Sequence, residues 1–176
     1  MASAAASNTS KSGEGRQYLT FHLADEEYGI DILRVQEIRG WEKVRPLPDT
    51  PDYILGIMSL RGEVIPVVDL RSRFGLEPQA PSELTVVIIV RLEHQGESRG
   101  MGLVVDAVSE VYRIEAKQHR EPPRFGGAIH ADLLQGVGMV DDNMIFLLDL
   151  DRLVRKGVLA EVDASTEDGA LDESAD

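Results

Sequence analysis

Short apolar runs separated by turn residues recur along most of the chain and predict β-strands. Residues 16–23 alternate in polarity, with Leu19, Phe21 and Leu23 on one face, as in a half-buried strand. A second strand begins at Tyr28 after a polar turn. Roughly ten such strands, with turns every eight to twelve residues, predict an all-β fold with only short helices. Two half-chains of about five strands each fit small barrels better than one open sheet, because closure removes exposed strand edges. Which strands belong to each barrel stays open, since intertwined barrels could exchange strands across the segment 78–81.

Arg61-Gly62 separates two apolar runs, residues 54–60 and 64–68, and is predicted to form the tip of a β-hairpin. Gly62 supplies the positive φ that such a turn needs, whereas turn chemistry does not account for the cation of Arg61. The run 64–68 is almost wholly apolar, so we expect it to be buried on both faces. Pro66 has no N–H to donate and should lie at a strand edge or a bulge.

Two further patterns concern local structure. Gly100 and Gly102, within a predicted strand over 99–105, indicate a bulge or a close approach of two backbone segments. Short helices are expected where an aspartate precedes an apolar turn, because its side chain accepts hydrogen bonds from the first N–H groups. The predicted caps are Asp31, Asp69 and Asp151, before helices over 32–38, 70–74 and 152–159.

Composition divides the chain into a central domain and two tails. The folded domain is expected to span residues 16–158, with its strongest internal boundary at the proline-containing segment 76–82. Residues 1–15 are rich in Ala, Ser and Gly and lack the apolar core of a signal peptide, so we expect a flexible tail. Residues 159–176 contain seven acidic residues and no Lys or Arg, which is typical of a disordered, solubilising tail.

The charge and cysteine content exclude several classes of partner. The formal net charge is −13, and the rest of the chain stays acidic without the last 18 residues, which argues against nucleic acid, because phosphate binding needs a basic surface. No apolar run approaches the roughly 18 residues of a membrane-spanning helix. The chain has no Cys, which fits a cytoplasmic protein.

The sequence offers no pattern that carries catalysis. There is no phosphate-binding Gly-Lys-Ser/Thr motif, no His-Glu-x-x-His zinc motif and no Gly-x-Ser-x-Gly nucleophile motif. The aspartate pairs are better explained by turns and helix caps than by metal binding. We therefore expect a protein that is not an enzyme and that needs no cofactor or metal. The four histidines, expected to be plain surface residues, are His22, His94, His119 and His130.

Four separated strings resemble the CheW family of chemotaxis coupling proteins, in order and at matching spacing. The resemblance runs from Gln17 to Val154. It implies two intertwined SH3-like five-stranded β-barrels and an adaptor without activity of its own. It also implies binding to the cytoplasmic hairpin tips of chemoreceptors and to the regulatory domain of the histidine kinase CheA, which is itself CheW-like. The strings are Asp25–Leu33, Val35–Gly40, Leu60–Gly62 continuing to Phe74, and Gly102–Asp106.

The resemblance also implies which residues bind the receptor or the kinase. Three positions match the family's Val-Gln-Glu-Ile string, three match its Gly-x-x-x-Leu-Arg-Gly string, and three match strands that line the receptor groove. These residues are, in that order, Val35, Glu37 and Ile38; Gly56, Arg61 and Gly62; and Val86, Val87 and Gly102. Arg120 and Phe125 resemble an Arg-x-x-Pro-x-Phe segment that contacts the kinase in rings beneath receptor arrays.

Several alternatives stay open. Each of these residues, taken singly, is also explained as a solvated charge or a peripheral core residue. A CheW-like scaffold could serve a pathway other than chemotaxis, such as surface motility or second-messenger control, and a receptor pull-down would separate the two. A fragment of a multidomain kinase or a receiver-fused adaptor is disfavoured, because no kinase or receiver motif is present. We expect the protein to be monomeric alone, cytoplasmic and recruited to membrane-associated receptor arrays without entering the membrane.

Overall fold

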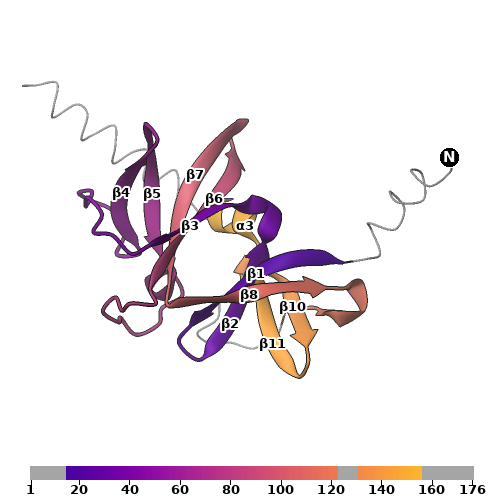
Figure 1. Ribbon diagram of the computed structural model, residues 1–176. Helices are drawn as coiled ribbons and strands as arrows, with labels where there is room; N and C mark the ends of the chain where they lie inside the picture. Colours follow the sequence, from indigo (N-terminus) through magenta and orange to yellow (C-terminus); the bar gives the residue numbers. More distant parts are fainter. Residues whose placement is uncertain (1–14, 123–130, 156–176) are drawn as a thin grey trace, which may run out of the picture.

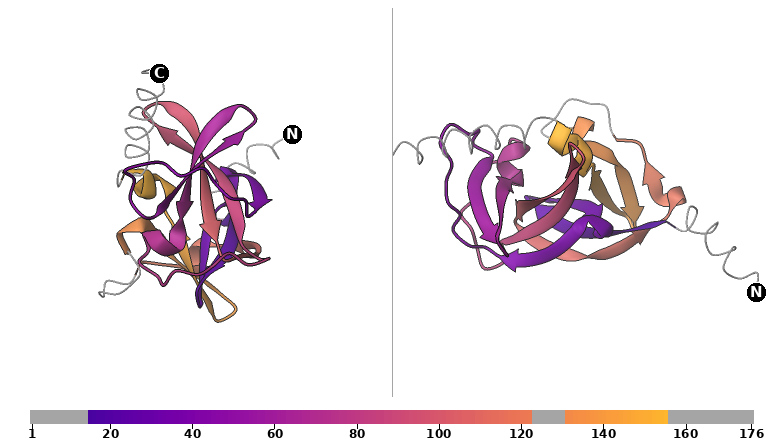
Figure 2. Two further views of the ribbon diagram at one scale, coloured as in Figure 1. Left: turned by 90° about the vertical axis from the view of Figure 1, so that its left-hand side faces the viewer. Right: turned by 90° about the horizontal axis from the view of Figure 1, so that it is seen from above.

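The computed structural model of the protein describes residues 15–122 and 131–155. A larger sheet has six strands in the order β8-β1-β2-β11-β10-β9, and a smaller sheet has five in the order β3-β6-β7-β5-β4. Each sheet curls into a small SH3-like barrel, and the two barrels lie side by side (Figures 1 and 2). The all-β prediction is confirmed.

The strand bounds follow the chain closely. The larger sheet consists of β1 (Arg16–Leu23), β2 (Glu26–Asp31), β8 (Ala107–Ile114), β9 (His119–Arg120), β10 (Leu134–Val140) and β11 (Asn143–Leu148). The smaller sheet consists of β3 (Val35–Gly40), β4 (Ile54–Leu60), β5 (Glu63–Asp69), β6 (Val86–His94) and β7 (Glu97–Val105). The helical segments are η1 (Ile32–Arg34), α2 (Leu70–Arg73), η2 (Ala116–Gln118), η3 (Ala131–Leu133) and α3 (Leu150–Arg155).

The two barrels exchange strands across the segment 76–82. The smaller sheet takes three strands from before this segment and two from after it, whereas the larger sheet takes β1 and β2 from before it and the rest from after it. The barrels are therefore intertwined, as the family resemblance implies, and do not coincide with the two halves of the chain. The reason is that β2 pairs in parallel with β11, and β5 in parallel with β7, and parallel partners must come from distant parts of the chain.

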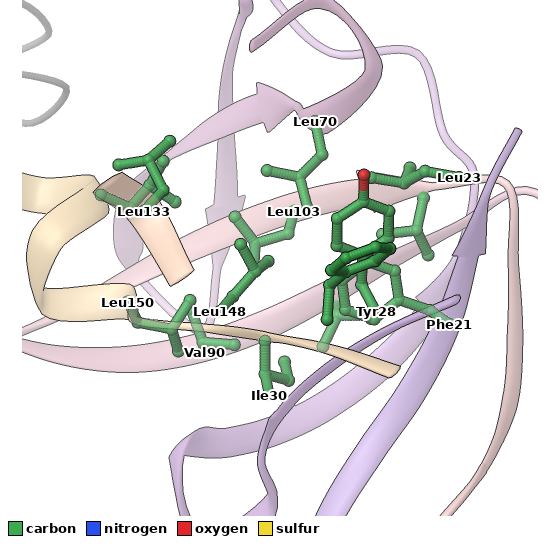
Figure 3. Packing of buried hydrophobic residues seen from close by; sticks show 14 of the residues in the cluster. Phe21, Leu23, Tyr28, Ile30, Leu70, Val90, Leu103, Leu133, Leu148 and Leu150 are labelled. Atoms are coloured by element: carbon green, nitrogen blue, oxygen red, sulfur yellow. The ribbon is translucent and has the colours of Figure 1, made fainter. Parts of the chain in front are cut away.

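The main hydrophobic core lies between the two sheets and draws residues from both (Figure 3). Tyr28 lies at its centre, with ring centroids 6.0 Å from Phe21, 5.4 Å from Phe74 and 5.6 Å from Phe146. Burial raises the pKa of the Tyr28 hydroxyl to about 12. Because this core is shared, neither barrel can be removed without exposing the apolar face of the other.

Each barrel also has a smaller cluster of its own. The interior cluster of the smaller barrel consists of Leu60, Ile65, Val67, Val87, Ile89 and Val104. In the larger sheet, Tyr18 packs with Ile114, Ile145 and Leu147. Strand β1 is consequently buried on both faces, because Tyr18 and Thr20 are buried as well as Leu19 and Phe21. It is not the half-buried strand that its alternation predicts.

An ion pair between Arg71 and Asp106 stabilises the junction where the chain passes from one barrel to the other. Asp106 is the single residue between β7 and β8, and its carboxylate accepts two hydrogen bonds from Arg71, at 2.7 and 2.8 Å. It accepts a third from the backbone N–H of Ala24, at 2.8 Å. Burial raises the pKa of Asp106, but the hydrogen bonds from Arg71 and Ala24 outweigh it and hold that pKa below its usual value.

The predicted hairpin at Arg61-Gly62 is confirmed. Both residues have positive φ, 51° and 83°, and the strands pair from Leu60–Glu63 onward, as in a two-residue type I′ turn. Two details differ. Val64 is exposed, because only the strand beyond it is covered on both faces. Pro66 lies in an interior strand, and its missing N–H is accommodated because the ladder with β7 begins only at Val67.

The helix caps follow the prediction in part. Asp69 caps α2, with its Oδ1 accepting from the N–H of Arg71 at 3.1 Å. Asp31 also caps, but only the short η1, and the predicted helix over 32–38 is mostly strand β3. The segment forms a strand because pairing with β6 provides hydrogen-bond partners for the backbone N–H and C=O groups of β3. At α3 the cap is Asp149, which accepts from the N–H of Arg152, and not Asp151.

Candidate functional site

One row of directly opposed residues crosses all five strands of the smaller sheet. It reads Glu37, Ile89, Gly102, Val67 and Gly56, from β3 to β4. Paired residues direct their side chains to the same face, and here that face is the barrel interior, because Ile89 and Val67 belong to the interior cluster. Three of the residues that the sequence singles out thus share one row, although 65 positions separate Glu37 from Gly102.

At the open end of the smaller barrel, Arg61 pairs with Glu37. The Arg61 Nη2 lies 3.3 Å from the Glu37 Oε2, so the hairpin tip meets the opposite edge strand of the same barrel. The Arg61 side chain is 68% exposed and that of Glu37 is 25% exposed. An ion pair this open contributes about 0–1 kcal/mol to stability. We call this pair, with Gly62, the rim.

The carboxylate of Glu37 is only half satisfied. Its Oε2 binds Arg61, whereas its buried Oε1 has no hydrogen-bond partner among the described residues. A carboxylate oxygen in this state favours an additional donor, because an unpaired buried polar atom costs free energy. The rim therefore combines a largely exposed cation, Arg61, with a buried carboxylate oxygen of Glu37 that lacks a hydrogen-bond partner among the described residues.

A second ion pair beside the rim was not predicted. Glu63 accepts from Arg91 at 2.8 and 3.0 Å and from the N–H of Gly100 at 3.3 Å. The hydrogen bond from Arg91 lowers the pKa of Glu63. Its signal in the sequence is that Arg91 interrupts an apolar run, residues 84–92, and a charge in such a run needs a partner.

Three predicted residues are buried and shape the barrel from within. Gly56, Val87 and Gly102 have no appreciable surface. A Cβ on Gly102 would lie 2.9 Å from the Val87 Cγ1. Gly56 has φ of 150°, and a Cβ there would overlap the carbonyl oxygen of Arg45. Because these residues are buried, a partner would not contact them directly. They would affect binding only by fixing the positions of the strands.

The remaining predicted residues of the smaller sheet belong to its other face. Ile38 is 44% exposed, whereas Val35 and Val86 are half-buried against the core between the barrels. Leu33, in η1, is 88% exposed and was not singled out in the sequence. The feature of the sequence that points to Leu33 is its position two residues after Asp31, the residue that caps η1. Leu33 and Ile38 therefore expose apolar surface on either side of Glu37 in the sequence, in η1 and on the other face of β3.

Arg120 lies apart from this group, on β9 at the edge of the larger sheet. It is exposed, and its Nη1 donates to the carbonyl oxygens of Lys117 at 2.7 Å and His119 at 3.0 Å. Phe125 lies outside the described residues. The two positions are thus not tested as a pair.

The described residues hold no group of three or more His, Cys, Asp or Glu side chains that would bind a metal ion. Within the same part of the chain, the helices are all too short or too polar to cross a bilayer. The chemistry available at the rim is therefore that of charge pairing and apolar contact, which is the chemistry of protein recognition.

Comparison with known proteins finds relatives over most of the chain. The family model described as the CheW-like domain matches residues 17–158. The chemotaxis protein CheW of Klebsiella aerogenes is 40% identical over 149 residues, covering 85% of this chain and 87% of the relative. CheW of Rhizobium meliloti is 34% identical over 137 residues, covering 78% and 86%.

A solved structure supports the same conclusion. The crystal structure of the scaffolding protein TtCheW from Thermoanaerobacter tengcongensis superimposes with a TM-score of 0.71 at 37% identity, covering 79% of this chain and 92% of that one. The two-barrel fold, the family match and these relatives agree, and the protein described here belongs to the CheW family of chemotaxis scaffold proteins.

Proposed function

We propose that the protein couples chemoreceptors to the histidine kinase CheA as a non-catalytic adaptor in the cytoplasm, recruited to receptor arrays at the membrane. The observation that carries this proposal is the rim. It presents Arg61, a largely exposed cation with a modest intramolecular partner, and β3, the strand that carries Glu37, also exposes the apolar side chain of Ile38. Interfaces concentrate their energy in arginine and apolar anchors arranged in this way.

The shape of a receptor tip fits this surface. A helical hairpin is recognised by an apolar surface with a few charges at its edge. The segment that carries Glu37 also exposes two apolar side chains, Leu33 of η1 and Ile38 of β3. In this proposal Glu37 and Arg61 bind polar groups of the receptor, and Ile38, Val35 and Val86 contribute apolar contact. The buried Gly56, Val87 and Gly102 hold the strands in place.

The kinase partner is the regulatory domain of CheA. If that domain resembles this protein, as the family resemblance implies, the two alternate in a ring, and Arg120 with Phe125 forms one of the ring contacts. Residues 16–158 then act as one unit, with the tails outside it. Individual contacts of this kind are weak, and a receptor array strengthens them by raising the effective concentration of each partner.

The test is co-sedimentation of the protein with receptor-bearing membranes, with and without CheA. We expect the protein to sediment with the membranes, CheA to sediment only when the protein is present, and kinase activity to rise in the ternary complex. If CheA sediments equally without the protein, or if the protein stays in the supernatant under all conditions, the proposed coupling is wrong. Receptor-free membranes serve as the control.

A further inference from the structure

The smaller barrel has a second opening, at the end of β5 opposite the rim. Asp69, six residues beyond Glu63, ends β5 there, and six strand residues span about 20 Å. A cavity of about 200 Å³ lies at this end, walled by Trp41, Leu55 and Val104 and by the loop 79–82. It is smaller than the roughly 300–1,000 Å³ of pockets for drug-sized ligands. Its size suits a single side chain.

The charge inside this cavity is negative. Three charged groups line it, Asp69, Arg71 and Asp106. The guanidinium of Arg71 is bound to both oxygens of Asp106, at 2.7 and 2.8 Å, and its Nη1 donates to the carbonyl oxygen of Glu77 at 2.6 Å. Arg71 and Asp106 thus neutralise each other, and the carboxylate of Asp69 supplies the net charge of the cavity.

Asp69 lies in a poorly hydrated position. Its side chain shares the barrel-interior face with Val67, two residues earlier on β5. The carboxylate accepts from the backbone N–H groups of Arg71 and Ser72, but burial outweighs these bonds and raises the pKa of the carboxyl, so its charge is solvated less well than in water. A cation placed beside it would replace the missing solvation and gain a charge-assisted hydrogen bond.

The walls of the cavity are suited to the stem and the charge of a basic side chain. Trp41 is half-buried against the interior cluster, and an indole ring attracts cations placed over its face. Leu55 and Val104 provide apolar contact for methylene groups. The far wall is fixed, because Thr85 and Ser82 exchange hydrogen bonds of 2.9 and 3.2 Å.

We propose that this cavity receives a basic side chain, a lysine ammonium or an arginine guanidinium, from a protein that docks against this end of the smaller barrel. The occupant is inferred from charge complementarity, since a net negative cavity with an aromatic wall favours a cation over a neutral or anionic group. The site is separate from the rim. It does not depend on receptor coupling, and its test contains neither receptor nor kinase.

The test is an NMR titration of the full chain with the tripeptide acetyl-Ala-Lys-Ala-amide and with its Arg counterpart. The chain has one Trp, and Trp41 lines the cavity, so its indole N–H resonance is a unique reporter of this wall. We expect at least one basic peptide to shift the Trp41 indole resonance and the amide resonance of Val104, with weak but saturable binding. The norleucine and Glu peptides should cause no such shift.

Asp69→Asn is the central variant, because Asn caps a helix as well as Asp does and so keeps α2 while removing the charge. We expect it to weaken binding of the basic peptide at least about tenfold. Asp142→Asn, on an exposed residue in the β10–β11 turn of the larger sheet, removes the same charge and should bind like the parent. Should Asp69→Asn fail to fold, Trp41→Leu replaces it, with weaker binding expected from the Val104 amide shift.

Several results would overturn the proposal. These are the absence of any indole or Val104 shift with either basic peptide, equal binding of the norleucine peptide, and undiminished binding by the variant tested. Tighter binding of free n-butylammonium than of the lysine peptide would also overturn it, because it would show that the cavity does not admit a side chain attached to a backbone.

Discussion

The packing of Gly102 against Val87 provides the sharpest test of how the smaller barrel is built. Both residues are buried, and a methyl group on Gly102 would lie 2.9 Å from the Val87 Cγ1, while its distances to Val67 and Ile89 would be an ordinary 3.5 and 3.6 Å. Of these three neighbours, only Val87 would therefore clash with a methyl group on residue 102. Gly102→Ala should cost about 1–3 kcal/mol by overpacking, because the β-branched Val87 cannot easily rotate away.

Val87→Ala should also destabilise when made alone. It removes two buried methyl groups, which cost about 0.8 kcal/mol each in transfer free energy, so the total is about 2 kcal/mol with the cavity that remains. In the double variant the new methyl group of residue 102 enters the space that Val87 vacates. The two costs should then fail to add, and the double variant should be at least about 1 kcal/mol more stable than their sum.

Urea unfolding of the parent, the two single variants and the double variant measures this coupling. Gly40→Ala is the matched control, because a Cβ there meets no atom within 4 Å, and we expect a change within about 0.5 kcal/mol. If the two effects add within error, or if Gly102→Ala alone leaves the free energy of unfolding unchanged, the interior packing described here is wrong. Receptor binding lost in Gly102→Ala should return in the double variant.

Three further predictions concern the backbone, the junction and a helix cap. Gly56→Ala should lower the free energy of unfolding by more than about 2 kcal/mol, since it combines a strained φ with overlap on the Arg45 carbonyl; an unchanged urea midpoint would contradict this. Asp106→Asn should cost about 1–3 kcal/mol at pH 7 by breaking the pair with Arg71. Because the folded pKa of Asp106 lies below its usual value, this difference should be constant above about pH 5 and shrink as the pH falls below about 4; a difference that grows on acidification would refute the assignment. Asp149→Ala should cost about 1 kcal/mol through loss of the α3 cap, visible as a lower thermal midpoint, and Asp149→Asn should restore it.

Sequence patterns predicted the local structure best where a single strand or turn decides it. The hairpin at Arg61-Gly62, the Asp69 cap and the strand β1 follow from short-range chemistry, and all three are present. The exchange of strands between barrels did not follow, because the parallel pairs β2–β11 and β5–β7 join distant segments. Asp31 caps only the short η1, because pairing of β3 with β6 replaces most of the helix predicted over 32–38.

The candidate site was predictable as a set of residues but not as an arrangement. The sequence marks Arg61 as a cation that its turn does not need, yet its partner Glu37 is 24 positions away. The buried state of Gly56, Val87 and Gly102 depends on which strands meet, which a pattern of apolar runs does not determine. The cavity beside Trp41 brings together five separate segments, and no single stretch of sequence indicates it.

The measurement that most directly tests the adaptor proposal separates the stability of Arg61→Ala from its binding. Removing a pair this exposed should change the free energy of unfolding by no more than about 1 kcal/mol, as urea unfolding will show. In parallel, co-sedimentation with receptor membranes and CheA reports assembly, with Arg113→Ala, an exposed arginine on β8, as the control. We predict a folded Arg61→Ala protein that no longer assembles the ternary complex or activates the kinase. A folded variant that assembles and activates normally would contradict the role given to the rim.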